Sequence, residues 1–279
     1  MNIRDIARHS RPIIAAHRGS CGGNIPPNTL FAYEAALFQG AAILETDVAR
    51  SRDGIFYMFH SGSGNELQYL NTDRPFEELY SEEIDSFYVL NEFQRPTTCR
   101  VSRFETFLKA FKGRGIINLD RAWDYWEYLI PTIDTFGMRD QILLKSPCES
   151  EWLNKAKRVA SDYAYMPIVV EDIGSFYAAG GDSLPGFCGA ELVFSSEDSP
   201  IIAENVPELL HRSGKAAWGN GIRFSQVKNL NAGHGDDISI TGHPEEGWGW
   251  LIRKGFDIIQ TDWVQALNNY IISLYPEKQ

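Results

Sequence analysis

The chain has 279 residues, of which 43% are hydrophobic and 23% are charged, a composition that fits one ordinary globular domain with a sizeable core. Its formal net charge of −11 argues against nucleic acid or an anionic membrane surface as a partner. No apolar run has the length of a membrane span or the form of a signal peptide, so we expect a cytoplasmic protein without stable membrane association.

Apolar runs typical of β-strands alternate along the chain with segments of helical periodicity, which is the pattern of βα units around a parallel sheet. In chain order, the predicted strands are Ile13 to Ala16, Ala42 to Val48, Ile55 to His60, Gly115 to Leu119, Gln141 to Leu144, Pro167 to Val170, Glu191 to Phe194, Lys215 to Trp218 and Asp257 to Gln260. These are nine strands for an eight-stranded barrel, so one is spurious or lies outside it. The predicted fold is α/β, a single TIM-type (β/α)8 barrel, regular or distorted, over residues 1–279.

Several helix boundaries can be predicted from capping residues. Asn28-Thr29 can cap a helix that stops at Gly40. Ser102 and Glu105 have capping-box spacing ahead of an apolar stripe. The stripe consists of Phe104, Phe107, Leu108 and Phe111, which we expect in the core. The last helix, Trp263 to Leu274, should close the barrel.

Two connections are long enough to cover a site. Residues 62–102 exceed an ordinary βα connection and are interpreted as an insertion over the active site. Residues 229–242 form a candidate lid, in which His234, Asp236 and Asp237 fit either a flexible loop or a second metal site. In a barrel, the loops that follow the strands build the active-site face.

The chemically most informative residues lie at the ends of the first three predicted strands. They are His17-Arg18-Gly19, Glu45-Thr46-Asp47 and His60. Because side chains alternate along a strand, Glu45 and Asp47 project from the same face as a pair of oxygen ligands. Two carboxylates held this close repel each other unless a positive group lies between them. One divalent cation, Mg²⁺ or Ca²⁺, is therefore the predicted cofactor.

The order of these motifs resembles that of the glycerophosphodiester phosphodiesterase family. The resemblance spans about residues 12 to 270 and rests on His17-Arg18-Gly19, Pro26-Pro27-Asn28-Thr29, Glu45-Thr46-Asp47, His60-Ser61, Ile117-Asn118-Leu119-Asp120, Trp218-Gly219-Asn220 and Ile259-Gln260-Thr261-Asp262. It implies a metal-dependent phosphodiesterase on a barrel, with Glu45, Asp47 and Asp120 as the metal ligands.

The sequence departs from the family pattern at four positions. Pro27 stands where the family has Glu, Ser61 where it has Asp, Asp120 where it has Glu, and Ala122 where it has a phosphate-contacting Lys. The nearest cations to the last position are Arg121 and Lys145. Strand alternation argues against Arg121 sharing the face of Asp120.

The remaining roles are predicted with alternatives. His17 and His60 are the catalytic candidates, one as base and one as acid in an order that the sequence leaves open. Arg18 either binds the substrate phosphate or braces Glu45. Lys145 either contacts the phosphate or ends a strand facing the surface. Trp218 either walls the substrate pocket or lies in the core.

Together these residues predict metal-dependent hydrolysis of a small glycerophosphodiester to an alcohol and glycerol 3-phosphate. The attacking group is water or a hydroxyl of the substrate's own glycerol. The alternatives are the same chemistry on a sugar phosphodiester or a lysophospholipid, and a catalytically silent barrel that binds a phosphorylated ligand. The sequence leaves the oligomeric state open.

Overall fold

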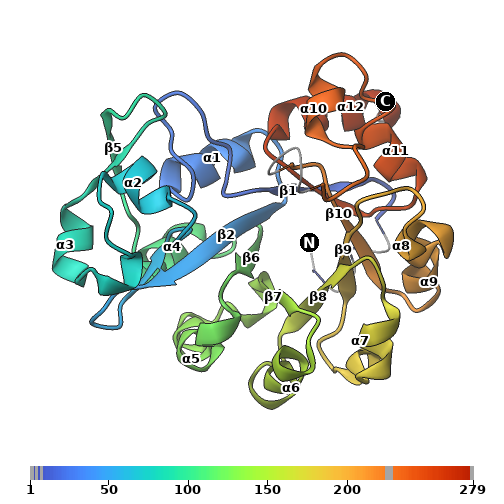
Figure 1. Cartoon of the computed structure of the whole chain (residues 1–279), viewed down its shortest axis with the longest axis horizontal. Coiled ribbons are helices and arrows are strands. Elements are labelled where there is room, and N and C mark those ends of the chain that lie inside the picture. The colour runs from blue at the N-terminus through green and yellow to red at the C-terminus, as the bar shows by residue number, and fades with distance from the viewer. Residues whose placement is uncertain (1–2, 4–5, 7–8, 224–228, 277–279) are drawn as a thin grey trace.

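The computed structural model describes residues 3, 6, 9–223 and 229–276. Within these residues, eight parallel strands close into a barrel with helices around it (Figure 1). In barrel order the strands are β1 (Ile13–Ala16), β2 (Ile43–Arg50), β6 (Ile116–Asp120), β7 (Ile142–Pro147), β8 (Ala164–Val170), β9 (Gly189–Val193), β10 (Ala216–Asn220) and β11 (Ile258–Thr261). Strand β1 pairs with both β2 and β11, which closes the sheet and confirms the predicted TIM-type barrel.

One predicted strand, Ile55 to His60, lies outside the barrel. It forms β3 (Phe56–Met58), which pairs antiparallel with the last residues of β2, Val48 to Arg50. Strand β2 is long enough to extend past the barrel rim, and the chain then reverses at Gly54, whose φ is +89°. This short connection permits a hairpin, whereas a parallel strand would need a crossover of a dozen or more residues. The expectation that His60 ends a barrel strand is therefore wrong.

Two layers of apolar side chains hold the barrel together. One lies inside it and is formed by small and branched residues of the strands with Trp218, and Ile3 and Ile6 from the N-terminal segment join this layer. The other lies between the strands and the surrounding helices and includes the whole predicted stripe of Phe104, Phe107, Leu108 and Phe111. Burial of both faces explains why the barrel strands are near-continuous apolar runs.

The barrel is surrounded by α1 (Leu30–Phe38), α4 (Phe104–Phe111), α5 (Trp126–Phe136), α6 (Ser150–Val159), α7 (Gly174–Ala178), α8 (Pro200–Ala203), α9 (Val206–Arg212), α11 (Trp248–Arg253) and α12 (Val264–Leu274). The three helices whose boundaries were predicted, α1, α4 and α12, begin close to the predicted residues. Thr29 caps α1 as predicted, because its hydroxyl accepts from the backbone N–H of Ala32. The predicted capping box at Ser102 is wrong: Arg103 is the N-cap of α4, and the Ser102 carbonyl accepts from the Met58 backbone N–H instead.

Residues 62–102 fold into a substructure of their own beside β2 and α1 (Figure 1). It contains α2 (Asn65–Leu70), α3 (Ser81–Ser86) and a hairpin of β4 (Tyr88–Leu90) and β5 (Pro96–Arg100) that the sequence analysis did not predict. Its side chains form a separate hydrophobic cluster around Phe76, together with Tyr57 and Phe59 from the segment that includes β3. The insertion thereby holds β3 and the following His60 in place beside the barrel mouth.

Residues 229–242 include the short helix α10 (Asp236–Ile240). The buried Asp236 carboxylate accepts hydrogen bonds from the Trp248 indole at 2.7 Å, the Thr261 hydroxyl at 2.8 Å and the Asp262 backbone N–H at 2.9 Å. These bonds tie the segment to the end of β11 and make Asp236 an anchor. Among the described residues, His234, Asp236 and Asp237 do not form a group that could hold a metal ion. In the ranges 9–223 and 229–276, no helix is long and apolar enough to cross a membrane.

Candidate functional site

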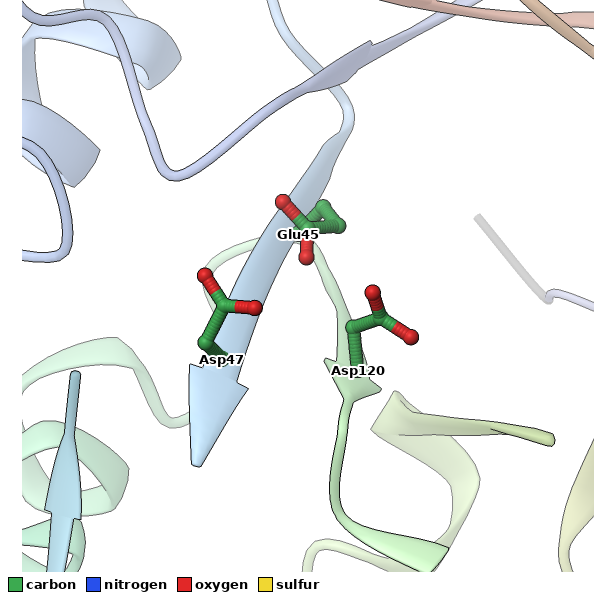
Figure 2. Close-up of side chains that lie close together, drawn as sticks. All are labelled: Glu45, Asp47 and Asp120. Atoms are coloured by element: carbon green, nitrogen blue, oxygen red, sulfur yellow. The ribbon is translucent and has the colours of Figure 1, made fainter. Parts of the chain in front are cut away.

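Three carboxylates from two neighbouring strands meet at the mouth of the barrel (Figure 2). Glu45 and Asp47 lie on β2 and Asp120 ends β6. The parallel register places Asp47 directly opposite Asp120 on the neighbouring strand. One oxygen from each of the three carboxylates lies within 4.8 Å of the others. The structure therefore brings together the three residues that were predicted as metal ligands.

The electrostatics of this cluster call for a positive charge. Glu45 and Asp47 are buried, at 2% and 1% exposure. Burial and the charge of Asp47 raise the pKa of Glu45 to about 8. Burial and the charges of Asp47 and Glu191 raise the pKa of Asp120 to about 6. Among the described residues, the buried Oδ1 of Asp120 has no hydrogen-bond partner. Hard oxygen ligands of this kind, closely spaced and buried, suit a divalent cation.

Arg18 contacts two of the carboxylates through different atoms. Its Nε lies 2.9 Å from Oδ2 of Asp47, and its backbone N–H donates to Oε2 of Glu45 at 2.8 Å. Both contacts depend on the turn after β1, in which Arg18 has φ +55° and Gly19 has φ +83°. A Cβ on Gly19 would lie 2.6 Å from the backbone carbonyl carbon of Ala32, so only glycine fits there. The side chain of Arg18 thus braces Asp47, where the sequence analysis had named Glu45.

His17 forms a hydrogen-bonded pair with Asp262, which follows β11. The distance from His17 Nδ1 to Asp262 Oδ1 is 2.8 Å. Burial lowers the pKa of His17, but the hydrogen bond with Asp262 and the charge of Glu45 outweigh it, so the pKa is raised. Asp262 ends the motif Ile259-Gln260-Thr261-Asp262, and no role was predicted for it. The only signal for a role of Asp262 was its position after a predicted strand. Its pairing with His17 could not be seen in the sequence, because the two residues are 245 positions apart.

His60 reaches the same site from the segment after β3. Its Nε2 lies 4.0 Å from Oδ1 of Asp47, and its Nδ1 lies 2.7 Å from the side-chain amide nitrogen of Asn65. Burial lowers the pKa of His60 to about 4. The two predicted catalytic histidines therefore lie beside the carboxylate cluster with opposite pKa shifts.

Lys145 and Trp218 lie inside the barrel instead of in the walls of the mouth. Lys145 is 1% exposed, and its Nζ lies 2.8 Å from Oε2 of Glu191 and 3.0 Å from the centre of the Trp218 ring. Trp218 is fully buried. The surface-facing alternative for Lys145 is wrong because its strand turns that side chain toward the barrel axis. Direct substrate contact by either residue does not fit this placement, and the core alternative describes Trp218.

An open pocket of about 570 Å³ occupies the barrel mouth. His17, Arg18, Asp47, His60, Asp120 and Arg121 contribute to its polar side, and Trp123, Ile168, Ile222 and Leu230 to its apolar side. A second pocket of similar volume lies on the other side of His17 and Arg18, with Tyr69 and Trp263 among its lining residues. Both pockets are of a size that holds a small molecule.

Arg121 is the residue that the alternation argument placed wrongly. It directly follows β6 and has φ +51°, so the regular alternation of the strand ends at Asp120. The turn directs its guanidinium into the mouth pocket, where Nη1 lies 3.4 Å from Nε2 of His60. A left-handed residue is rarely recognisable from sequence when it is not Gly, Asn or Asp.

Comparisons with known proteins agree with this arrangement. Residues 17–144 match the glycerophosphoryl diester phosphodiesterase family, and residues 165–271 match a domain of unknown function, DUF4996. A stretch of 51 residues is 45% identical to "Glycerophosphodiester phosphodiesterase GDPD6" of Arabidopsis thaliana. The stretch covers 18% of this chain and 13% of that protein.

Solved structures extend the likeness of fold to the whole chain. A glycerophosphoryl diester phosphodiesterase from Parabacteroides distasonis has a TM-score of 0.77 at 18% identity, covering 100% of this chain and 94% of its own. A phosphodiesterase from Oleispira antarctica, solved with the product sn-glycerol-3-phosphate, has a TM-score of 0.64 at 17% identity, covering 96% and 99%.

The matched range 17–144 contains both histidines and all three clustered carboxylates. Members of this family are hydrolases that act on phosphodiester bonds. Through these residues, the range 17–144 of the chain is similar to the glycerophosphoryl diester phosphodiesterase family.

Proposed function

We propose that the protein hydrolyses a small, water-soluble glycerophosphodiester to an alcohol and glycerol 3-phosphate with the help of one divalent cation. The observation that carries the proposal is the cluster of the buried Glu45 and Asp47 with the partly buried Asp120, which has His17 and His60 beside it at the barrel mouth. The Oleispira antarctica phosphodiesterase of similar fold was solved with sn-glycerol-3-phosphate as its product.

The proposed metal ligands are the three clustered carboxylates. The raised pKa values of Glu45 and Asp120 and the unpartnered buried oxygen of Asp120 within the described chain support this assignment, since a cation would relieve both costs. When bound, Mg²⁺ or Ca²⁺ would neutralise phosphoryl oxygens and lower the pKa of the attacking hydroxyl. Arg18 holds Asp47 and Glu45 in position for this role through its side chain and its backbone.

We assign His17 as the base. Asp262 accepts the proton on Nδ1, so Nε2 is the atom that takes up and releases a proton. In the reaction, Nε2 of His17 would accept the proton of the attacking hydroxyl as its oxygen forms a bond to phosphorus. The bond between phosphorus and the oxygen of the alcohol would break, and that oxygen would leave with a proton taken from solvent water in the open pocket, while His17 returns its proton to solvent.

We assign His60 as a hydrogen-bond donor to the phosphate of the substrate. Its Nδ1 faces the amide of Asn65, and its Nε2 faces the mouth pocket near Asp47. This arrangement presents an N–H group to the reacting phosphate. The proposed mechanism therefore uses both histidines in different roles. His17 accepts a proton, and His60 donates a hydrogen bond.

The deciding experiment is a substrate screen with purified protein. Glycerophosphocholine, glycerophosphoethanolamine, a sugar phosphodiester and a lysophospholipid are each incubated with Mg²⁺, Ca²⁺ or EDTA, and the released alcohol and glycerol 3-phosphate are measured. We expect cation-dependent release of glycerol 3-phosphate from the first two. Preference for the sugar diester or the lysophospholipid would replace the proposed substrate class. Binding of these diesters with no turnover under any condition would support a silent binding barrel.

A further inference from the structure

We propose that Arg121 is a phosphate-contacting residue, and that its Nη1 and the Nε2–H of His60 donate together to one anionic oxygen of the substrate's phosphate. The proposal rests on the proposed function and names a residue of its binding site. Arg121 would also supply the cation that is missing at the next position, Ala122.

The backbone places Arg121 for this contact. Its left-handed conformation ends the β6 alternation, so the side chains of Asp120 and Arg121 both line the mouth pocket although they are consecutive residues. A strained backbone at a non-glycine residue is common where function requires a particular side-chain direction. The φ of +51° thus delivers a cation to the carboxylate cluster from the strand end that carries one of its members.

Asn65 determines which nitrogen of His60 carries the proton. The amide nitrogen of Asn65 donates to the Gly62 carbonyl at 2.9 Å, and this carbonyl can only accept. The amide orientation is thereby fixed, and its second N–H points at Nδ1 of His60, 2.7 Å away. Nδ1 must then accept, so the proton of the neutral imidazole sits on Nε2.

Two donors therefore face each other across the pocket. Arg121 Nη1 lies 3.4 Å from His60 Nε2, with a guanidinium N–H directed at this ring nitrogen. When Nε2 carries the proton, both atoms are donors and cannot satisfy each other. The nearest carboxylate oxygen to Nε2, Oδ1 of Asp47, is 4.0 Å away and beyond hydrogen-bond distance. An anionic oxygen placed between the two donors would satisfy both.

Two other cations near the site each form an ion pair with a carboxylate. The Nε of Arg18 contacts Asp47, and the Nζ of Lys145 contacts Glu191. In the described part of the chain, Arg121 forms no ion pair with a carboxylate, and its contact with His60 is to an imidazole. Arg121 is thus a cation at the mouth whose charge no carboxylate of the described residues pairs, and a guanidinium binds phosphate oxygens through strong charge-assisted hydrogen bonds.

The test uses inorganic phosphate as the probe, so that it does not depend on turnover. Its dissociation constant is measured by calorimetry on the Mg²⁺-loaded protein for wild type, Arg121→Asn and Arg121→Lys. Asparagine tolerates the left-handed conformation without the charge, and lysine keeps the charge without the fork. Arg212→Gln, at an exposed arginine paired with Glu208 on α9, is the control for loss of one surface charge.

We expect Arg121→Asn to weaken phosphate binding on the order of 10-fold to 100-fold, as for loss of one charge-assisted hydrogen bond. Arg121→Lys should fall between wild type and Arg121→Asn, Arg212→Gln should match wild type, and all of the variants should still bind Mg²⁺. Phosphate affinity in Arg121→Asn equal to that of wild type, or no phosphate binding by wild type, would overturn the proposal.

A second readout checks the donor arrangement directly. In protein labelled with ¹⁵N at histidine, we expect His60 to show a protonated Nε2 and an unprotonated Nδ1 at neutral pH. Asn65→Asp should move the proton to Nδ1, turn Nε2 into an acceptor for Arg121 and weaken phosphate binding. A protonated Nδ1 in wild type would contradict the proposal.

These measurements separate the inference from the function on which it rests. Phosphate binding that depends on Arg121 in a protein that hydrolyses no diester would remove the proposed function and keep the anion contact. Diester hydrolysis with the same KM and kcat in wild type and Arg121→Asn would keep the function and remove the role of Arg121.

Discussion

Asp47 and Asp120 are register partners on the neighbouring parallel strands β2 and β6, so their carboxylates project side by side into the barrel mouth. Their charges repel, and each strand contributes its carboxylate from a rigid element of the barrel. Such a pair is ready to share a cation without rearrangement of the backbone.

The first prediction concerns Asp120→Asn. This change should weaken Mg²⁺ binding at least about tenfold, because one of three charged ligands is lost. It should leave the melting temperature of the metal-free protein unchanged or raise it, because the charges of Asp47 and Glu191 repel the charge of Asp120. Calorimetric titration with Mg²⁺ and thermal melts in EDTA measure both effects. Asp140→Asn, at the opposite end of the barrel strands, is the matched control, and equal Mg²⁺ affinity in both variants would remove Asp120 from the metal site.

The second prediction concerns pH and the pair of His17 with Asp262. The pKa of His17 is raised in the folded protein, so the pair stabilises the fold below the unfolded pKa near 6.5, and this contribution is lost as pH rises through the folded pKa. Asp262→Asn should lower the pKa of His17 and move the rising limb of the pH–rate profile to lower pH. Histidine NMR titration and urea unfolding across pH 5 to 8 check this. Asp237→Asn, which changes an exposed nearby carboxylate, is the control. If the pKa of His17 is the same in Asp262→Asn as in wild type, the pairing of His17 with Asp262 is contradicted.

The third prediction compares two glycines with positive φ. Gly19→Ala and Gly23→Ala should both cost about 1–2 kcal/mol for the left-handed conformation. Gly19→Ala should cost roughly 1–3 kcal/mol more from overpacking, because its Cβ would press on the backbone of Ala32, whereas no atom lies within 4 Å of a Cβ on Gly23. Only Gly19→Ala should also reduce activity, since it displaces Arg18. Urea unfolding compares the two, and equal stability losses would show that the turn adjusts freely.

The fourth prediction concerns the buried pair of Lys145 and Glu191. Lys145→Met leaves the Glu191 carboxylate without its cation and should destabilise the protein by about 3–5 kcal/mol. Adding Glu191→Gln should recover much of this loss, because glutamine is neutral and its oxygen can still accept from the Asn220 amide. Chemical denaturation of wild type, the two single variants and the double variant measures the coupling. A loss below about 1 kcal/mol for Lys145→Met would mean that the pair is not the structural element described here.

The sequence determined the barrel and the core of the site by itself. Alternating apolar runs and capped helices identified all eight barrel strands, and the spacing of Glu45 and Asp47 placed both carboxylates on one face of β2. These inferences hold because the two-residue period of a strand is local and is set by the chain itself. Thr29 and the buried stripe before Phe111 were predictable for the same reason.

Only the tertiary structure decided which residues meet across the barrel. The hairpin of β3 took His60 out of the barrel, and pairing across 245 positions gave His17 its partner Asp262. Lys145 was drawn to Glu191 on a strand that lies two places away in the sheet, and one left-handed residue turned Arg121 toward the carboxylates. Such contacts depend on how strands close around an axis and on single backbone dihedrals, and neither leaves a periodic signal in the order of the residues.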